Sequence, residues 1–205
     1  MNTPNLLSQK INEMTTAGTA VSDIINLYKT YGHKGYDGEP VSQASHMIQC
    51  AMLAIRERES DELVIGAFLH DIGHLLKHEE HAETMGNYGV ANHEEIGAVY
   101  LQQRGFSERV CSIVNMHVEA KRYLVATDET YEEKLSPASL ETLKWQGGPM
   151  SPEEATRFSK HPFFDDIIKV RLWDESAKDT EAYLLPLSFF QTLIRNYLTD
   201  RNYTG

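Results

Sequence analysis

The sequence predicts an all-α fold. Apolar residues recur at helical spacing through most of the 205 residues. Segments with this spacing begin at residues typical of helix N-caps and end near glycines. No stretch shows the sustained apolar–polar alternation of a strand, and no internal repeat is present. The length suits one domain over residues 1–205 with enough residues to bury a core.

The first helices follow from local signals. A weak amphipathic pattern over residues 6–28 predicts the first helix, and the glycine-rich segment KTYGHKGYDGEP predicts a loop. We expect Pro40 in the first turn of the helix VSQASHMIQCAMLAIRER. Ser60 is expected to cap the next helix, which runs through the apolar segment FLHDIGHLL and is weakened at its end by Gly73.

The second half of the chain gives clearer boundaries. Asn92 as cap and Glu95 three residues later predict a helix that stops at Gly105. The segment SERVCSIVNMHVEAKRYL predicts a long helix beginning at Ser107. Two shorter helices, SPASLETLKWQ and SPEEATRF, follow, and the second has the Ser–Glu pattern of a capping box. The last predicted helices are DDIIKVRLWDESAK and LSFFQTLIRNYL.

Composition excludes several classes of partner. A formal net charge of −11 and a pI of about 5.2 argue against binding to nucleic acid or to an anionic membrane. No run approaches the roughly 18 apolar residues of a membrane span, and the start resembles no signal peptide. Cys50 and Cys111 read as free thiols of a reducing compartment. We therefore expect a cytoplasmic protein without nucleic-acid or membrane partners.

Ionisable side chains fall on faces of the predicted helices that should be buried. His70 and Asp71 lie side by side within FLHDIGHLL, and an ionised carboxylate is costly to bury unless a positive charge compensates it. His117 and Lys121 share the apolar stripe of the helix that begins at Ser107. A histidine alone on such a face is usually a satisfied core residue. The lysine one turn later indicates the wall of a cleft instead.

Three other segments show related patterns. Arg171 and Asp174 project from the apolar face of DDIIKVRLWDESAK, where an internal salt bridge at i,i+3 spacing is an equally good interpretation. His46 lies at the edge of an inward face, and His93 lies in the first turn of its helix.

Together, these residues predict a metal site. Four imidazoles and two carboxylates suit borderline to hard ions, with iron and manganese as candidates. Six protein ligands on one ion would leave little room for a substrate, whereas two ions that share one carboxylate would leave open positions. Asp71, beside His70, is the natural bridge. The predicted metal ligands are His46, His70, Asp71, His93, His117 and Asp174.

The same residues carry a family resemblance. The order H…HD…H…H…D is the ligand order of HD-domain proteins with a dinuclear site. The segments YDGEPVSQASH, AFLHDIGH, NHEEIGAVYLQQRGFSERV, HVEAKRYL, LSPASLETLKWQGGPMS and RLWDESAK resemble the HD-type mixed-valent diiron oxygenases that cleave organophosphonates. Myo-inositol oxygenase is a more distant relative. The resemblance covers about residues 36–178.

This resemblance implies a fold, a cofactor and a reaction. The fold would be an HD-domain helical bundle with a dinuclear metal site in its core. An Fe(II)/Fe(III) pair would be bridged by Asp71, with His46, His70 and Asp174 on one iron and His93 and His117 on the other. With O2 as co-substrate, the C–P bond of a 1-hydroxy-2-(amino or trimethylammonio)ethylphosphonate would break, giving phosphate and glycine or glycine betaine.

The resemblance also assigns residues to the phosphonate group. Lys121 and Arg171, already placed on core faces, occupy family phosphonate-binding positions, and they supply the cations that a dianion needs. Ser139 and His74 occupy two more such positions. Ser139 could instead be a helix residue near the Ser136 cap, and His74 could face solvent.

A loop motif of the family is present as well. Tyr36 and Glu39 match a mobile Y-x-G-E loop, in which the tyrosine is a labile iron ligand that gates the site and the glutamate faces the substrate amine. The segment could also be an ordinary turn. Asp37, with Tyr28 and Tyr31 nearby in sequence, would suit a quaternary ammonium group.

Two other functions compete with an oxygenase. A dinuclear HD phosphohydrolase or phosphodiesterase would use the metals to activate water and would work without oxygen. The GYP tripeptide of the cyclic-dinucleotide enzymes is absent after the HD pair. A non-enzymatic metal-dependent sensor would not need Lys121, Arg171 and Ser139 together. The methylation state of the substrate nitrogen and the oligomeric state stay open.

Overall fold

The computed structural model describes residues 6–36, 38–76 and 91–201, with side chains described from Ala17 onward. These residues form α-helices and one short 3-10 helix, and no strand occurs among them. The prediction of an all-α HD-domain fold is confirmed. Across the described ranges, none of the helices combines the length and apolar character needed to span a membrane.

The helices follow one another along the chain with short connections. Their bounds are α1 (Leu6–Tyr31), α2 (Gln43–Arg56), α3 (Asp61–Leu69), α4 (Ile72–Leu76), α5 (His93–Gln102), α6 (Glu108–Thr127), η1 (Glu132–Lys134), α7 (Pro137–Trp145), α8 (Pro152–Phe158), α9 (Phe164–Ser176) and α10 (Leu187–Arg201).

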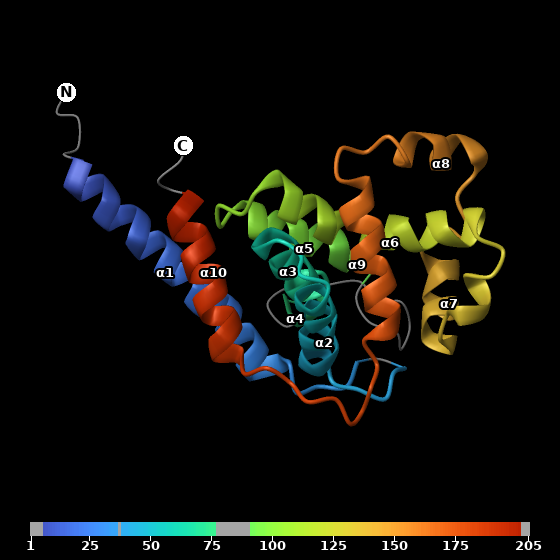
Figure 1. The fold of residues 1–205 in the computed structure, drawn as a ribbon, viewed down its shortest axis with the longest axis horizontal. Coiled ribbons are helices and arrows are strands. Elements are labelled where there is room, and N and C mark those ends of the chain that lie inside the picture. Colours follow the sequence, from blue (N-terminus) through green and yellow to red (C-terminus); the bar gives the residue numbers. More distant parts are fainter. Residues whose placement is uncertain (1–5, 37, 77–90, 202–205) are drawn as a thin grey trace.

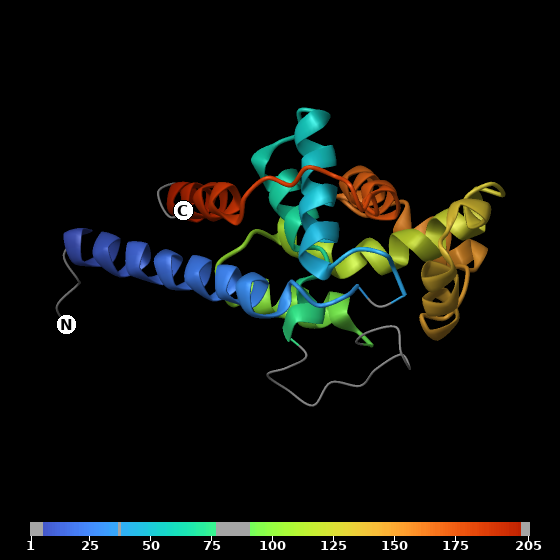
Figure 2. The same ribbon diagram turned by 90° about the horizontal axis from the view of Figure 1, so that it is seen from below.

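The central helices surround the future site. α2 packs on α3 and α9, and α6 packs on α3, α5 and α9. α1 and α10 lie against each other at one end of the molecule, and α7 and α8 lie at the opposite end (Figures 1 and 2). Phe68 of α3 stacks between Tyr28 and Phe190, with ring centroids 4.4 and 4.2 Å away, and so joins the terminal helices to the core.

Serine caps fix most helix starts. The side chains of Ser42, Ser107, Ser136 and Ser151 each accept a hydrogen bond from a backbone N–H in the first turn, and the predicted Ser151–Glu154 capping box is present.

Three boundary predictions were wrong. Pro40 precedes the cap of α2 and lies outside that helix, and α1 continues to Tyr31. Ser60 and Asn92 occupy cap positions, but neither side chain makes a capping hydrogen bond. Asn92 instead has a left-handed backbone with φ of 58°.

The helix expected through FLHDIGHLL is interrupted at the HD pair. α3 ends at Leu69 and α4 begins at Ile72, so His70 and Asp71 lie in the turn between them. Both are buried. The break directs a histidine and a carboxylate into the centre of the bundle from one turn.

Gly73 permits the close approach of α4 and α5, and alanine there should damage the structure. A Cβ at position 73 would lie 1.9 Å from the backbone oxygen of His93. Because the obstacle is backbone, α5 must shift, which we expect to lower the melting temperature by roughly 5–10 °C. Differential scanning calorimetry measures this. Gly18→Ala is the control, since its Cβ meets nothing within 4 Å. An unchanged melting temperature in Gly73→Ala would show that the two helices can separate freely.

Candidate metal centre

The structure brings all six predicted metal ligands together. They come from α2, the α3–α4 turn, α5, α6 and α9, and none is more than 4% exposed. These residues are His46, His70, Asp71, His93, His117 and Asp174.

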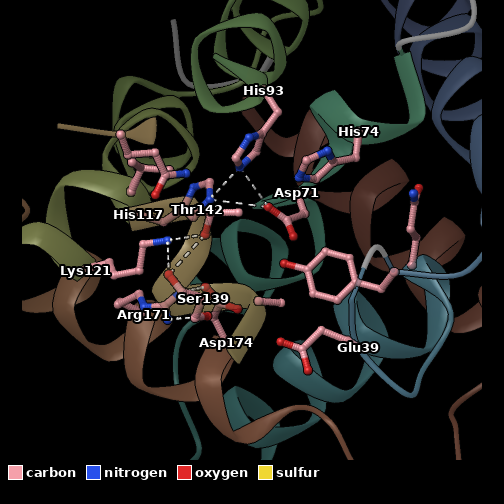
Figure 3. Close-up of a pocket in the computed structure, with 15 residues that line it drawn as sticks. Glu39, Asp71, His74, His93, His117, Lys121, Ser139, Thr142, Arg171 and Asp174 are labelled. Atoms are coloured by element: carbon pink, nitrogen blue, oxygen red, sulfur yellow. Dashed lines mark hydrogen bonds and ion pairs between the residues drawn. The ribbon is translucent and has the colours of Figure 1, made fainter. Parts of the chain in front are cut away.

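The histidines form two pairs around one carboxylate. The Nε2 atoms of His46 and His70 are 3.1 Å apart, and those of His93 and His117 are 3.0 Å apart. Asp71 Oδ1 is 3.2 and 3.3 Å from the second pair, while its Oδ2 is 3.7 and 3.5 Å from the first. Figure 3 shows Asp71 directed at His93 and His117. Each oxygen of Asp71 therefore faces a different histidine pair.

Asp174 extends the first pair. Its Oδ1 atom is 3.2 Å from Nε2 of His46 and 3.9 Å from Nε2 of His70. The internal salt bridge with Arg171, which spacing alone suggested, is also present. Asp174 thus has one oxygen on the histidine cluster and the other on the guanidinium.

The outer ring nitrogens of three histidines face backbone oxygens. Nδ1 of His46 is 3.0 Å from the oxygen of Ala177, and the Nδ1 atoms of His70 and His117 are 2.8 and 2.7 Å from the oxygens of residues 67 and 114. A neutral imidazole donates its only N–H in such a contact and leaves a lone pair on Nε2. Two lone pairs about 3 Å apart repel unless a proton or a cation lies between them.

The donor set fits metal ions. Two donors bound at about 2.1 Å and at right angles lie about 3.0 Å apart, which matches the separations within the histidine pairs. Oδ2 of Asp71 is buried without a hydrogen-bond partner among the described residues. A buried carboxylate oxygen with no donor is expected where a cation binds.

The charges favour the same interpretation. Burial raises the pKa of Asp71, but His70, His117 and His93 outweigh burial and hold that pKa well below its usual range. Burial lowers the pKa of His70 to about 4. The aspartate is therefore ionised and this histidine neutral at pH 7, as metal ligands must be.

His74 belongs to the same cluster. It is buried, which excludes the solvent-facing alternative, and its ring stacks on His93 with centroids 4.0 Å apart. Ligand atoms of Asp71, His74 and His93 lie within 4.8 Å of one another. His74 also lines the adjoining cavity.

A cavity of about 540 Å³, including its solvent-open part, adjoins the cluster (Figure 3). The residues that line it include eight predicted site positions outside the first histidine pair, and several that sequence reasoning missed. The predicted ones are Tyr36, Glu39, Asp71, His74, Lys121, Ser139, Arg171 and Asp174, and the missed polar ones are Gln43, Thr142 and Gln146.

Lys121 reaches the cavity wall from α6. Its Nζ donates to Thr142 Oγ1 at 2.8 Å and to the backbone oxygen of Ser139 at 3.4 Å. Burial, and then the nearby Arg171, lower the pKa of Lys121 to about 7. This lysine is a cation that gives up its proton readily.

Arg171 is held on three sides. Its Nε donates to Tyr131 Oη at 2.8 Å, Nη1 pairs with Asp174, and Nη2 pairs with Glu175. Burial lowers its pKa, but the Asp174 carboxylate and the other partners outweigh burial, so the pKa lies well above its usual value. Arg171 is a fixed, permanently charged wall of the cavity.

Ser139 has both of the roles considered from sequence. Its N–H donates to the Ser136 cap at 3.1 Å, and its hydroxyl lines the cavity and donates to Glu175 at 3.0 Å. Glu175, four residues after Arg171, thus contacts both groups. That i,i+4 spacing was the available signal for Glu175.

The loop residues take distinct places. The Tyr36 ring stacks on His46 with centroids 4.3 Å apart, and burial, then Asp71, raise the pKa of its hydroxyl. Glu39 lines the cavity and pairs with Lys178, a residue that sequence reasoning also missed. Asp37 lies outside the described residues.

The tyrosines expected near Asp37 do not form a nitrogen pocket. Tyr28 is buried in the core, where its hydroxyl donates to the backbone oxygen of Phe68. Tyr31 is half-buried, with the Lys34 ammonium 5.0 Å from its ring centroid, and neither tyrosine lines the cavity. That part of the prediction was wrong because both side chains lie on α1, which faces the core at α3 and α10.

Comparison with known proteins places this centre in a family. Residues 44–155 match the HD domain family, which is more than half of the chain. The chain is 39% identical over 189 residues to an uncharacterized protein of Acanthamoeba polyphaga mimivirus, covering 92% of this chain and 86% of that one.

Two further relatives carry functional names. A 1-hydroxy-2-(trimethylamino)ethylphosphonate dioxygenase (glycine-betaine-forming) of Leisingera caerulea is 42% identical over 161 residues, covering 78% of this chain and 81% of that one. A hydroxymethylphosphonate dioxygenase of Gimesia maris is 37% identical over 186 residues, with 89% and 90% covered. The predicted resemblance is confirmed, and the chain belongs to the HD-domain family.

Proposed function

We propose that this protein is an iron- and O2-dependent oxygenase that cleaves the C–P bond of a small 1-hydroxyphosphonate. The observation that carries the proposal is a bridging carboxylate, Asp71, beside a cavity whose wall holds Lys121 and Arg171. A metal-ligand cluster next to two anion-binding cations suits a substrate with a dianionic end. The names of the two phosphonate dioxygenases support the same reaction class.

The cluster would hold an Fe(II)/Fe(III) pair. His46, His70 and Asp174 would hold one iron, His93 and His117 the other, and Asp71 both. When bound, the iron pair supplies the redox chemistry by which O2 is used. We propose these six side chains as its ligands because their nitrogen and oxygen atoms converge from five parts of the chain.

The remaining residues bind and orient the substrate. Lys121 and Arg171 take the phosphonate oxygens, with His74 and Ser139 beside them. The Ser139 hydroxyl donates to Glu175 in this structure, so it must rotate to donate to a phosphonate. The Tyr36 ring covers His46 and must move aside for a substrate to reach the centre.

The proposed substrates are 1-hydroxy-2-aminoethylphosphonate and its N-trimethyl analogue. One O2 is consumed for each C–P bond broken. Carbon 1 leaves as a carboxylic acid, glycine or glycine betaine, and phosphorus leaves as phosphate. All atoms of O2 and substrate are accounted for in these two products.

Phosphate release should require oxygen. We expect iron-loaded protein to release phosphate from (R)-1-hydroxy-2-aminoethylphosphonate or its N-trimethyl analogue in air, and roughly 100-fold more slowly under argon. A colorimetric phosphate assay measures both rates. Protein loaded with manganese or magnesium is the control, because a phosphohydrolase would accept these metals. Release that persists under argon would establish hydrolysis instead.

A further inference from the structure

Lys178 lies two residues after the end of α9, and its ammonium joins two carboxylates at the edge of the cavity. Its Nζ is 2.9 Å from Glu39 Oε1 and 2.7 Å from Glu175 Oε1, and it donates to Ser136 Oγ at 3.1 Å. The side chains of Lys178 and Glu39 are 14% and 6% exposed. With three partners for three N–H bonds, this lysine is a fixed internal charge rather than a solvated one.

Through Glu39, Lys178 ties the tyrosine loop to α9. Glu39 lines the cavity, and its backbone N–H donates to the backbone oxygen of Tyr36 at 2.8 Å. The Tyr36 ring in turn covers His46. Figure 3 shows Glu39 and Lys121 on different sides of the pocket. The cavity thus has cations at one side and a carboxylate, neutralised by Lys178, at another.

We propose that Lys178 occupies the place of a substrate's cationic nitrogen and thereby sets the preference of the site among phosphonates. This inference rests on the proposed function. A zwitterionic 1-hydroxyphosphonate would put its phosphonate on Lys121 and Arg171 and its ammonium on Glu39. The ammonium would replace Lys178 as the partner of Glu39.

The exchange is inexpensive because Lys178 has a second carboxylate. When Glu39 leaves, Lys178 keeps Glu175, its shorter contact, and the Ser136 hydroxyl, so no buried charge is left unpaired. Glu39 is also neutralised, by the substrate. A phosphonate without nitrogen offers Glu39 no cation, and therefore it has to bind with the Glu39–Lys178 pair intact.

The test is binding without turnover. Iron-loaded protein is titrated calorimetrically under argon with (R)-1-hydroxy-2-(trimethylammonio)ethylphosphonate and with hydroxymethylphosphonate. In Lys178→Met we expect the trimethylammonio ligand to bind roughly tenfold more tightly and hydroxymethylphosphonate to change by less than about twofold. Lys178→Arg, whose fork holds carboxylates more firmly, should weaken the trimethylammonio ligand. Exposed Lys160→Met is the matched control and should change neither.

A second substitution shows whether Glu39 carries the effect. In Lys178→Met/Glu39→Gln the gain for the trimethylammonio ligand should disappear. A gain that survives Glu39→Gln, or equal changes for both phosphonates in Lys178→Met, would overturn the proposal.

Titration with tetramethylammonium chloride separates this inference from the proposed function. If neither phosphonate binds the wild-type protein, the proposed function fails. Tetramethylammonium should still bind more tightly to Lys178→Met than to wild type, and the same order in both proteins would overturn the role of Lys178. Because Lys178→Arg keeps the charge, it remains testable should Lys178→Met fold poorly.

Discussion

Replacing Asp71 with alanine should remove the bound iron and abolish the proposed oxygenase activity. Its two carboxylate oxygens face the two histidine pairs separately, so one substitution removes a ligand from both halves of the centre. Removing a group that merely supports a metal ligand costs roughly 10- to 100-fold in affinity, and a shared ligand should cost more. Iron content by atomic absorption and oxygen-dependent phosphate release measure the two losses.

Asp165→Ala is the matched control for this experiment. Asp165 is exposed in the first turn of α9, on the helix that carries Asp174, and it should keep both iron and activity. Circular dichroism checks that Asp71→Ala is folded. A folded Asp71→Ala protein with the full iron content would refute the proposed ligand set, because the centre would then not depend on its central carboxylate.

The fold was predictable because its signals are local. Ser107, Ser136 and Ser151 cap their helices through hydrogen bonds within one turn, and the apolar periodicity of each helix is visible without its neighbours. The interruption at His70 was not predictable in this way. Apolar residues continue on both sides of it, and the break is accompanied by a contact between Gly73 and His93, which are distant in sequence.

The candidate site divides along the same line. A histidine or aspartate on an apolar face is a costly placement, so residues such as His117 and Asp174 could be recognised one helix at a time. Glu175 and Lys178 lie at the end of a helix, where charged residues are usually solvated. Their role depends on Ser136 and Glu39, which come from other parts of the chain. Only the assembled structure shows these contacts.

Replacing Lys121 with alanine should weaken binding of a phosphonate while leaving the iron in place. Lys121 lines the cavity, and its Nζ contacts Thr142 and Ser139, neither of which is a candidate metal ligand. A charge-assisted hydrogen bond to an anion is worth about 1.5–3 kcal/mol, so the KM for the phosphonate should rise roughly 10- to 100-fold. Steady-state phosphate release and iron analysis measure the two effects. Exposed Lys134→Ala should change neither. Loss of iron in Lys121→Ala would mean that the lysine supports the metal centre instead.

The pH dependence separates the charge of Lys121 from its shape. Its pKa is lowered to about 7, first by burial and then by Arg171, so the ammonium is present below pH 7 and is lost as the pH rises. Because an anionic phosphonate needs the ammonium, kcat/KM of the wild-type protein should fall above pH 7. Lys121→Arg stays charged at every pH tested and should lose this alkaline limb, and Lys121→Ala should lose it at a much lower kcat/KM. If the same alkaline limb persisted in both variants, the titrating group would lie elsewhere, and the phosphonate would depend on Arg171 for its permanent positive charge.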